Sequence, residues 1–276
     1  MIEFLIRITF GLSVLASCTF LSETPIPRKD GGDYIKPENI WIFLMTGQSN
    51  MAGRGTMESQ DLVTNKRIIT LDSGGEWIVA KEPLHFYEPS GAGLDCGISF
   101  AQELLKNIPD SITIGMVPCA VGGSSVFNWL NDSEHRGVKL LSNFKNKVVL
   151  SKAKGTIKGI LWHQGESNAK PTDIPVYKDS LVALFDEFRN KIGDEELPIL
   201  MGELGRFAEP VEKAGYFSEI NLILAGIAEE EEHCYLISSE GLGHKGDNLH
   251  FNSAAQRELG RRYAITYLEK FLNKKR

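Results

Sequence analysis

The sequence predicts a single α/β domain in which helices cover both faces of a central parallel sheet. Apolar runs of strand type alternate along the chain with segments whose apolar residues recur at helical spacing. Behind its N-terminal segment the chain has about 250 residues, a length that suits one α/β domain. It shows neither an internal repeat nor a second-domain boundary, so we expect one domain over residues 40–276.

Each predicted strand is a short apolar run, and we expect strands at 40–45, 112–117, 157–162, 198–201 and 234–238. Helical spacing of apolar residues predicts helices around 98–105, 177–188 and 217–227. The last helix has the clearest start, because Ser253 followed by Gln256 has the pattern of a capping box. Residues 54–96 show little periodicity beyond a strand candidate at 67–71, so we expect an elaborated surface insertion there.

Residues 1–21 have the pattern of an export signal, because Arg7 precedes an apolar run too short to cross a bilayer. Glu3 weakens the pattern, and an amphipathic or buried N-terminal segment is the alternative. The stretch that ends at Cys18 is similar to the lipobox of bacterial lipoproteins, in which that cysteine is lipidated. Residues 22–39, rich in Pro, Gly and charge, are then a tether. We expect a periplasmic or extracellular protein, or an outer-membrane lipoprotein attached only through Cys18.

The composition of the chain limits the kinds of partner and site that we expect. The net charge of −6 is spread through the sequence and argues against a nucleic acid partner. No apolar run after the N-terminal segment approaches bilayer length, so we expect a soluble body. Besides Cys18 the chain has Cys96, Cys119 and Cys234, whose wide spacing is typical of buried thiols or one disulfide, not of a zinc site. A catalytic role for Cys119 is the weaker alternative, since no His or Asn pattern flanks it.

Polar residues of rare types follow the predicted strands directly. Ligands bind outside the carboxyl ends of the strands in open parallel α/β sheets, so these residues are expected to converge on one site. Ser49 follows the first strand through Gly47, at a turn that would lift its hydroxyl to the sheet edge and leave its backbone N–H free. It is the candidate nucleophile, although a serine that only caps a helix would look the same.

An acid and a base stand close together near the end of the chain. Asp247 and His250 lie three positions apart, so the aspartate can accept from Nδ1–H while Nε2 turns towards a serine, as a catalytic triad requires. A capping aspartate beside an exposed histidine is the alternative. The neighbouring His244 is interpreted as a loop residue.

Donors for a developing oxyanion are the third requirement of acyl transfer. The glycine pair after the second main strand can bring backbone N–H groups close to a ligand, and we predict Gly122, with Gly123 as the neighbouring alternative. Gln164, after the third main strand, has a side-chain amide of suitable reach. A simple turn and a structural glutamine are the alternatives for these two features.

Further polar residues beside these motifs are candidates for substrate binding, namely Gln48, Asn50, Glu166 and Arg206. Glu166 would either orient Gln164 or contact substrate. Arg206 would face an acidic substrate, or pair with Glu203. Trp129 would stack on a sugar or pack in the core, and His163 is interpreted as a core histidine.

Four stretches resemble the signature blocks of the SGNH (GDSL-like) hydrolases, namely Gly47–Gly53, Ala120–Ser124, Trp162–Asn168 and Asp247–Asn252. More narrowly, they are similar to the sialate O-acetylesterase and acetylxylan esterase group of carbohydrate esterase family 6. The resemblance implies a three-layer α/β/α flavodoxin-like fold, no metal or other cofactor, and deacetylation of carbohydrates. It also implies Ser49, Asp247 and His250 as the triad, with the amides of Ser49 and Gly122 in the oxyanion hole. Gln164 takes that role by position, where many SGNH enzymes have asparagine.

Two other classes of function compete with a carbohydrate O-acetylesterase. A metal-dependent hydrolase could use His163, Glu166, Asp247 and His250, but the sequence has no His-x-x-x-His or Asp-x-His cluster. A carbohydrate-binding protein without turnover would be expected to lack a triad residue, and none is missing. A lipase or thioesterase of the same superfamily stays open, because fold and triad do not determine the acyl group. Acetylxylan and O-acetyl sialic acid are the expected types of substrate.

Overall fold

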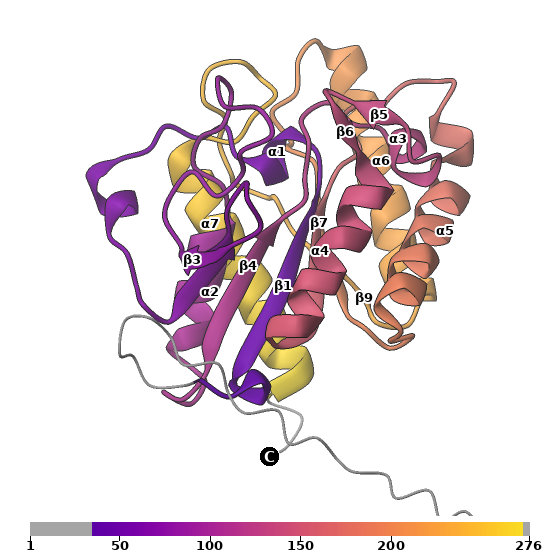
Figure 1. Cartoon of the computed structure of the whole chain (residues 1–276). Helices are drawn as coiled ribbons and strands as arrows, with labels where there is room; N and C mark the ends of the chain where they lie inside the picture. Colours follow the sequence, from indigo (N-terminus) through magenta and orange to yellow (C-terminus); the bar gives the residue numbers. More distant parts are fainter. Residues whose placement is uncertain (1–34, 273–276) are drawn as a thin grey trace, which may run out of the picture. The chain divides into compact units, whose positions relative to one another are not determined.

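The computed structural model describes residues 35–272, which form one compact unit (Figure 1). The predicted export signal, the lipobox at Cys18 and most of the predicted tether lie outside the described residues. The described chain opens with a turn of 3-10 helix, Pro37–Asn39, and enters the first strand at Ile40.

A seven-stranded sheet forms the centre of the domain in the order β3-β2-β4-β1-β7-β8-β9. Its five main strands are β1 (Ile40–Gly47), β4 (Thr113–Pro118), β7 (Thr156–His163), β8 (Ile199–Gly202) and β9 (Cys234–Ile237). They run parallel, and they confirm all five strands that the sequence predicts. Only the edge strand β3 (Trp77–Val79) is antiparallel, to β2 (Ile68–Leu71).

Helices cover both faces of the sheet, as Figure 1 shows. One face packs against α2 (Gly97–Leu105) and α7 (Ser253–Tyr267), and the described part of the chain finishes with a turn of π-helix, Leu268–Leu272. The other face packs against α3 (Val126–Leu130), α4 (Leu140–Lys154), α5 (Ile174–Ile192) and α6 (Val211–Glu230). The remaining elements are short: α1 (Ser49–Ala52), a 3-10 turn (Ser59–Leu62) and the hairpin strands β5 (Glu134–His135) and β6 (Val138–Lys139).

Strand β1 shows why the sheet is buried on both faces. Ile42 and Leu44 pack into the core beneath α3 to α6, whereas Phe43 and Met45 pack into the core beneath α2 and α7. All four side chains are fully buried. A continuous apolar run is what a central parallel strand needs, because each of its faces meets a helical layer.

Two expectations about the elements were wrong. The 67–71 segment is not part of a surface insertion, because β2 is a buried strand of the central sheet that pairs in parallel with β4. The strand candidate at 67–71 is itself confirmed as β2, and its four residues are all buried. The cap of α7 is Asn252, whose side chain accepts from the Ala255 N–H at 2.9 Å, and Ser253 donates instead to the Thr56 carbonyl.

The structure also shows the state of the cysteines and the character of the helices. Cys96, Cys119 and Cys234 are buried free thiols, so of the two expected states the structure has thiols and no disulfide among them. Burial raises the pKa of Cys119 to about 12, which leaves it protonated and unreactive at neutral pH. Within residues 35–272 no helix is both long and apolar enough to cross a membrane.

Candidate active site

The nucleophile candidate stands where the carboxyl ends of β1 and β7 meet. Gly47 closes β1 with a φ of 126°, and any Cβ on it would collide with the carbonyl of His163. The Gln48 N–H then donates to the same carbonyl at 2.9 Å, and the chain turns into α1, of which Ser49 is the first residue. Glycine is therefore required here, because the two strand ends approach too closely for a side chain.

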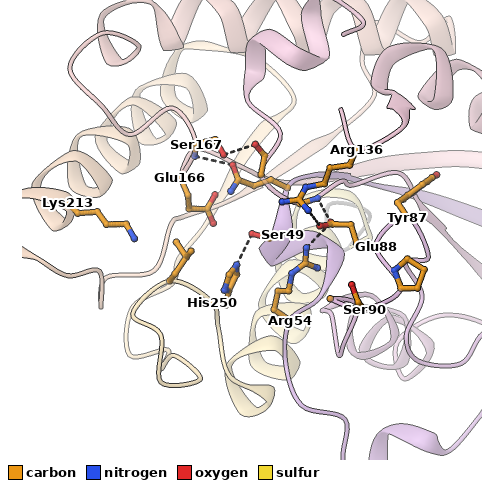
Figure 2. A pocket seen from close by; sticks show the side chains of 16 residues that line it. Ser49, Arg54, Tyr87, Glu88, Ser90, Arg136, Glu166, Ser167, Lys213 and His250 are labelled. Carbon is orange, nitrogen blue, oxygen red and sulfur yellow. Dashed lines mark hydrogen bonds and ion pairs between the residues drawn. The ribbon is translucent and has the colours of Figure 1, made fainter. Parts of the chain in front are cut away.

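Ser49, His250 and Asp247 form one hydrogen-bonded chain. His250 Nε2 lies 3.0 Å from Ser49 Oγ, and His250 Nδ1 lies 2.7 Å from Asp247 Oδ2. Figure 2 shows the ring of His250 facing Ser49 in the pocket. The arrangement matches the geometry of a serine–histidine–aspartate triad, although 201 positions separate the serine from the histidine.

Asp247 is held in its charged form. Partial burial by itself would raise the pKa of this carboxyl, but the N–H and the ring of His250, with the N–H of Leu249, donate to it and lower its pKa to about 2. The carboxylate can therefore only accept from the histidine, so it keeps the proton of the neutral ring on Nδ1 and leaves Nε2 free to accept from Ser49.

His244 braces the loop that carries Asp247 and His250. Its Nδ1 accepts from the N–H groups of Gly246 and Asn248, each at 3.1 Å, and these two residues flank Asp247. Because Nδ1 accepts twice, the ring proton lies on Nε2. The sequence places His244 in a loop, which is correct, but nothing in the sequence indicates this bracing role.

Asn50 joins the nucleophile segment to the histidine loop. Its Nδ2 donates to Glu166 Oε1 at 2.6 Å and to the Leu249 carbonyl, and its Oδ1 accepts from the Phe251 N–H. The side chain is buried and does not line the pocket. The structure therefore places Asn50 in the framework of the site and not on the surface that a substrate would touch.

Gln164 does not reach the pocket either. It is fully buried, and its Nε2 donates to Asn168 Oδ1 at 2.7 Å and to Gln48 Oε1 at 3.2 Å. Tyr177 donates to its Oε1. The amide that the sequence predicts as an oxyanion donor is thus engaged by protein groups.

Gln48 has the free amide instead. It lines the pocket next to Ser49, and its Oε1 accepts from Gln164 Nε2 and from the Ser167 N–H, both at 3.2 Å. Two donors on the oxygen fix which end of the amide is the NH2 group. This Nε2 has no acceptor in the part of the chain that the structure describes. Gln164 therefore positions Gln48, and the sequence analysis misjudged which of the two glutamines faces outward.

In the glycine pair too, the free donor belongs to the neighbour of the predicted residue. The Gly122 N–H donates to Glu88 Oε2 at 2.5 Å, so it is not available to a ligand. The Gly123 N–H has no acceptor among residues 35–272, and the same holds for the Ser49 N–H. Gly123 has a φ of 77°, a conformation that glycine adopts at no steric cost. The free donors beside Ser49 are thus Ser49 N–H, Gly123 N–H and Gln48 Nε2.

Glu88 belongs to a charged cluster that the sequence analysis missed. Its carboxylate lies 2.7 Å from Arg54 Nη2 and 3.2 Å from Arg136 Nη1 (Figure 2). Burial alone would raise the pKa of Glu88, but Arg54, the Gly122 N–H and Arg136 outweigh it and lower the pKa. No motif indicated these residues, because they come from three separate loops.

These groups enclose a cavity of about 650 Å³, large enough for a sugar residue with its neighbour. Its walls carry three cationic side chains, Arg54, Arg136 and Lys213, and two carboxylates, Glu88 and Glu166. Ser49 and His250 lie within it. The pocket therefore carries charged side chains of both signs around Ser49.

Glu166 faces this cavity beside a neutral histidine. Burial lowers the pKa of His163, and its Nε2 donates to the Glu203 carbonyl at 3.0 Å, so its Nδ1 carries no proton for Glu166, 3.6 Å away. Glu166 accepts from Asn50 and forms no hydrogen bond with Gln164 among the described residues, so it does not orient Gln164, and the substrate contact stays a prediction. His163 is a core histidine, as predicted.

Two other candidates lie elsewhere. Arg206 donates to both oxygens of Glu203 at 2.9 Å, and it lines a separate cavity beside α6, so the ion pair is the correct alternative and the substrate contact is not. Trp129 is fully buried, donates to Ser124 Oγ and packs in the core. Among the described residues no group of three or more His, Cys, Asp or Glu side chains could hold a metal ion.

Known proteins place this geometry in a family. The family described as "Carbohydrate esterase, sialic acid-specific acetylesterase" matches residues 39–269. The "Probable carbohydrate esterase At4g34215" of Arabidopsis thaliana is 30% identical over 249 residues, which cover 83% of this chain and 91% of that protein. Its crystal structure has a TM-score of 0.75 at 29% identity and covers 85% of this chain and 100% of that one.

Two more distant structures share the fold. NanS has a TM-score of 0.68 at 17% identity, with 88% of this chain and 100% of that chain covered. XAC1771, a carbohydrate acetylesterase from Xanthomonas citri, has a TM-score of 0.59 at 20% identity, with 84% of this chain and 56% of that chain covered. The likeness confirms the predicted α/β/α fold of the SGNH hydrolases. Together with the match over residues 39–269, it shows that this chain belongs to the sialic acid-specific acetylesterase family of carbohydrate esterases.

Proposed function

We propose that this protein is a serine esterase that removes O-acetyl groups from carbohydrates of the acetylxylan or O-acetyl sialic acid type. The observation that carries the proposal is the chain of hydrogen bonds from Asp247 through His250 to Ser49, beside a cavity of about 650 Å³ lined by charged side chains. Membership of a carbohydrate esterase family supports the same class of reaction.

The geometry implies a reaction in two stages, acetylation of Ser49 and then release of acetate. His250 Nε2 takes the proton of Ser49 as Oγ attacks the acetyl carbonyl, and Asp247 stabilises the imidazolium that forms. The same histidine then protonates the sugar oxygen that leaves, and an acetyl group stays on Ser49. A water molecule, activated by His250, then attacks the acetyl group on Ser49 and releases acetate.

Three free donors would stabilise the oxyanion of each tetrahedral intermediate. These are the N–H groups of Ser49 and Gly123 and the side-chain amide of Gln48. Removal of one such donor typically lowers kcat by about 10²–10³. Gly123 and Gln48 thus take the parts that the sequence analysis assigned to Gly122 and Gln164.

The walls of the cavity would recognise the sugar. Glu166 lines the cavity, but its Oε1 accepts from Asn50 and its Oε2 is buried without a partner among the described residues, so a sugar could reach this carboxylate only after a small shift of the side chain. Arg54, Arg136 and Lys213 can donate to hydroxyl or carboxylate oxygens of the glycan. Several charged groups able to bind hydroxyl or carboxylate oxygens support a carbohydrate substrate.

The test is acetate release from acetylated xylan and from O-acetylated sialic acid by the full chain, with Ser49→Ala as the control. We expect release from one of the two and a loss of at least about 10⁴-fold in the variant, with the melting temperature preserved. Turnover by Ser49→Ala at more than a few per cent of the parent rate would contradict the mechanism. A Ser49-dependent rate that peaks on longer acyl esters would move the function to a lipase or thioesterase.

Export of the chain is a separate proposal, which rests on residues 1–21 alone. The mass of the N-terminal peptide of the mature protein tests it. A diacylglyceryl group on Cys18 would support a lipoprotein, and an intact Met1 in the mature protein would contradict export.

A further inference from the structure

We propose that Glu88 and His135 form a clamp on Gly122 that sets the direction of the neighbouring Gly123 N–H, the backbone donor of the candidate oxyanion hole. Glu88 accepts from the Gly122 N–H at 2.5 Å, and His135 Nε2 lies 2.9 Å from the Gly122 carbonyl oxygen. Among the described residues neither side chain forms a hydrogen bond with Ser49 or His250, so both would act as positioning residues. The proposal rests on the function proposed above.

The contact of His135 determines the orientation of one peptide group. A carbonyl oxygen only accepts, so His135 carries its proton on Nε2 and donates to Gly122. The Gly122 carbonyl and the Gly123 N–H belong to the same planar trans peptide and point in opposite directions. The ring that holds the carbonyl on one side therefore aims the Gly123 N–H to the other side.

The contact of Glu88 holds the peptide before it. A side chain on Gly122 would collide with the Glu88 carboxylate and with Arg54, so the close approach needs glycine. Arg54 donates to Glu88 through Nη2 and to the Gly53 carbonyl through Nη1, which links the clamp to the end of α1. Arg136 approaches the other carboxylate oxygen at 3.2 Å.

A Gly-Gly sequence needs such a clamp because its own backbone has little restraint. A Cβ at Gly123 would meet no atom closer than 3.7 Å, so sterics do not hold this residue in place. Beyond the clamp, the Gly123 carbonyl accepts from Ser167 Oγ at 3.0 Å, and Ser124 is held by its Oγ, which donates to the Gly47 carbonyl, and by its N–H, which donates to Val121. An oxyanion donor must have its direction set before the reaction, since reorientation during the step would raise the barrier.

The position of His135 is itself built into the β5–β6 hairpin. The turn residues Arg136 and Gly137 have φ values of 51° and 79°, and Glu134 pairs with Lys139 across the hairpin. The hairpin thus presents two consecutive side chains to the glycine loop, His135 to the Gly122 carbonyl and Arg136 to Glu88.

A matched pair of variants tests the clamp. His135→Gln keeps an N–H donor at a similar reach, whereas His135→Leu has none. We expect His135→Leu to lower kcat about 30-fold with KM within about threefold of the parent, because the lost interaction matters mainly in the transition state. His135→Gln should keep kcat within about threefold. A second measurement is the rate at which a fluorophosphonate labels Ser49, followed by intact mass, and it should fall in parallel with kcat.

Two outcomes would overturn the clamp. One is a His135→Leu enzyme with kcat and labelling rate within twofold of the parent. The other is an equal loss in His135→Gln and His135→Leu, which would show that the donated hydrogen bond is not what matters. Melting temperatures near that of the parent exclude unfolding as the cause of a loss. If the parent labels at Ser49 but releases no acetate from either glycan, the proposed substrate fails while the labelling rates still decide the clamp.

Discussion

This chain contains two aspartate–histidine pairs with the same bond but different surroundings. In both pairs Nδ1 of the histidine meets Oδ2 of the aspartate, at 2.7 Å between His250 and Asp247 and at 3.0 Å between His85 and Asp95. Asp247 keeps 37% of its side chain exposed at the rim of the pocket, whereas Asp95 has none exposed. His250 Nε2 faces Ser49, but His85 Nε2 is buried with no partner among residues 35–272.

The difference teaches that the bond alone does not make a catalytic pair. Asp95 uses its second oxygen to accept from the Gly97 N–H at 2.7 Å, so it holds the start of α2. The pair is therefore a structural support beneath the 80–96 loop. What distinguishes His250 is access: its second nitrogen points at a hydroxyl in an open cavity.

The largest expected effect separates the two aspartates directly. Asp247→Asn should lower kcat about 10³-fold, because the amide no longer holds the required tautomer, with little change in melting temperature. Asp95→Asn should leave kcat unchanged but lower the free energy of unfolding by about 3 kcal/mol, because it breaks a buried pair. Steady-state kinetics and scanning calorimetry on both variants measure this. A loss of kcat in correctly folded Asp95→Asn would remove the distinction between the pairs.

The two glutamines Gln48 and Gln164 test the same idea, that a side chain can donate to the substrate only if its amide has no protein partner. Gln48→Ala removes the amide that faces the cavity and should lower kcat about 10²-fold. Gln164→Ala removes only the residue that positions it, and we expect about a tenfold loss together with a lower melting temperature. Kinetics on the two variants give the ranking. A larger loss of kcat in Gln164→Ala than in Gln48→Ala would return the donor role to Gln164.

His244 is a third histidine for this comparison, and its Nδ1 only accepts hydrogen bonds. In His244→Asn, Oδ1 can take over the acceptor position of Nδ1, so kcat should stay within about twofold of the parent. His244→Leu leaves the Gly246 and Asn248 N–H groups without their acceptor and should cost about 5–10-fold in kcat, roughly the effect of one or two neutral hydrogen bonds on the position of Asp247. Equal rates for the leucine and asparagine variants would show that the loop keeps its shape without His244.

The smallest effect concerns Glu82, which is buried beside the Asp95 pair with both carboxylate oxygens unpartnered in the described structure. Burial, and then the charge of Asp95, raise its pKa well above the usual value of 4.5. The folded state therefore keeps a proton that the unfolded state releases. Its stabilising effect is complete below the unfolded pKa and declines as the pH rises through the folded pKa.

Glu82→Gln is the variant that shows this titration. Glutamine does not titrate, so the melting temperature of the variant relative to the parent should rise with pH, by roughly 2–4 °C between pH 5 and pH 8. Calorimetry across that range measures the difference. A constant difference would mean that the pKa of Glu82 is the same in the folded and unfolded states and is therefore not raised.

Much of the fold and the triad was predictable from local patterns. The five main strands are mostly apolar, and the nearly complete burial of β1 and β4 follows from that composition. Ser49, Asp247 and His250 stand in short motifs at places where a parallel sheet brings loops together, so their meeting in the structure agrees with the prediction. The buried strand β2 was misjudged because four residues are too few for periodicity to outweigh the irregular chain around them.

The sequence by itself determined the layered fold, the candidate catalytic residues and their places along the chain, because periodicity and short motifs are local properties. Only the tertiary structure decided that Gln48 and not Gln164 faces the cavity, that Gly123 and not Gly122 has a free N–H, and that Arg206 lies elsewhere. Each of these depends on a hydrogen-bond partner brought in from another part of the fold, such as Glu88 for Gly122. A donor is free only when no such partner reaches it, and that is a property of the folded chain.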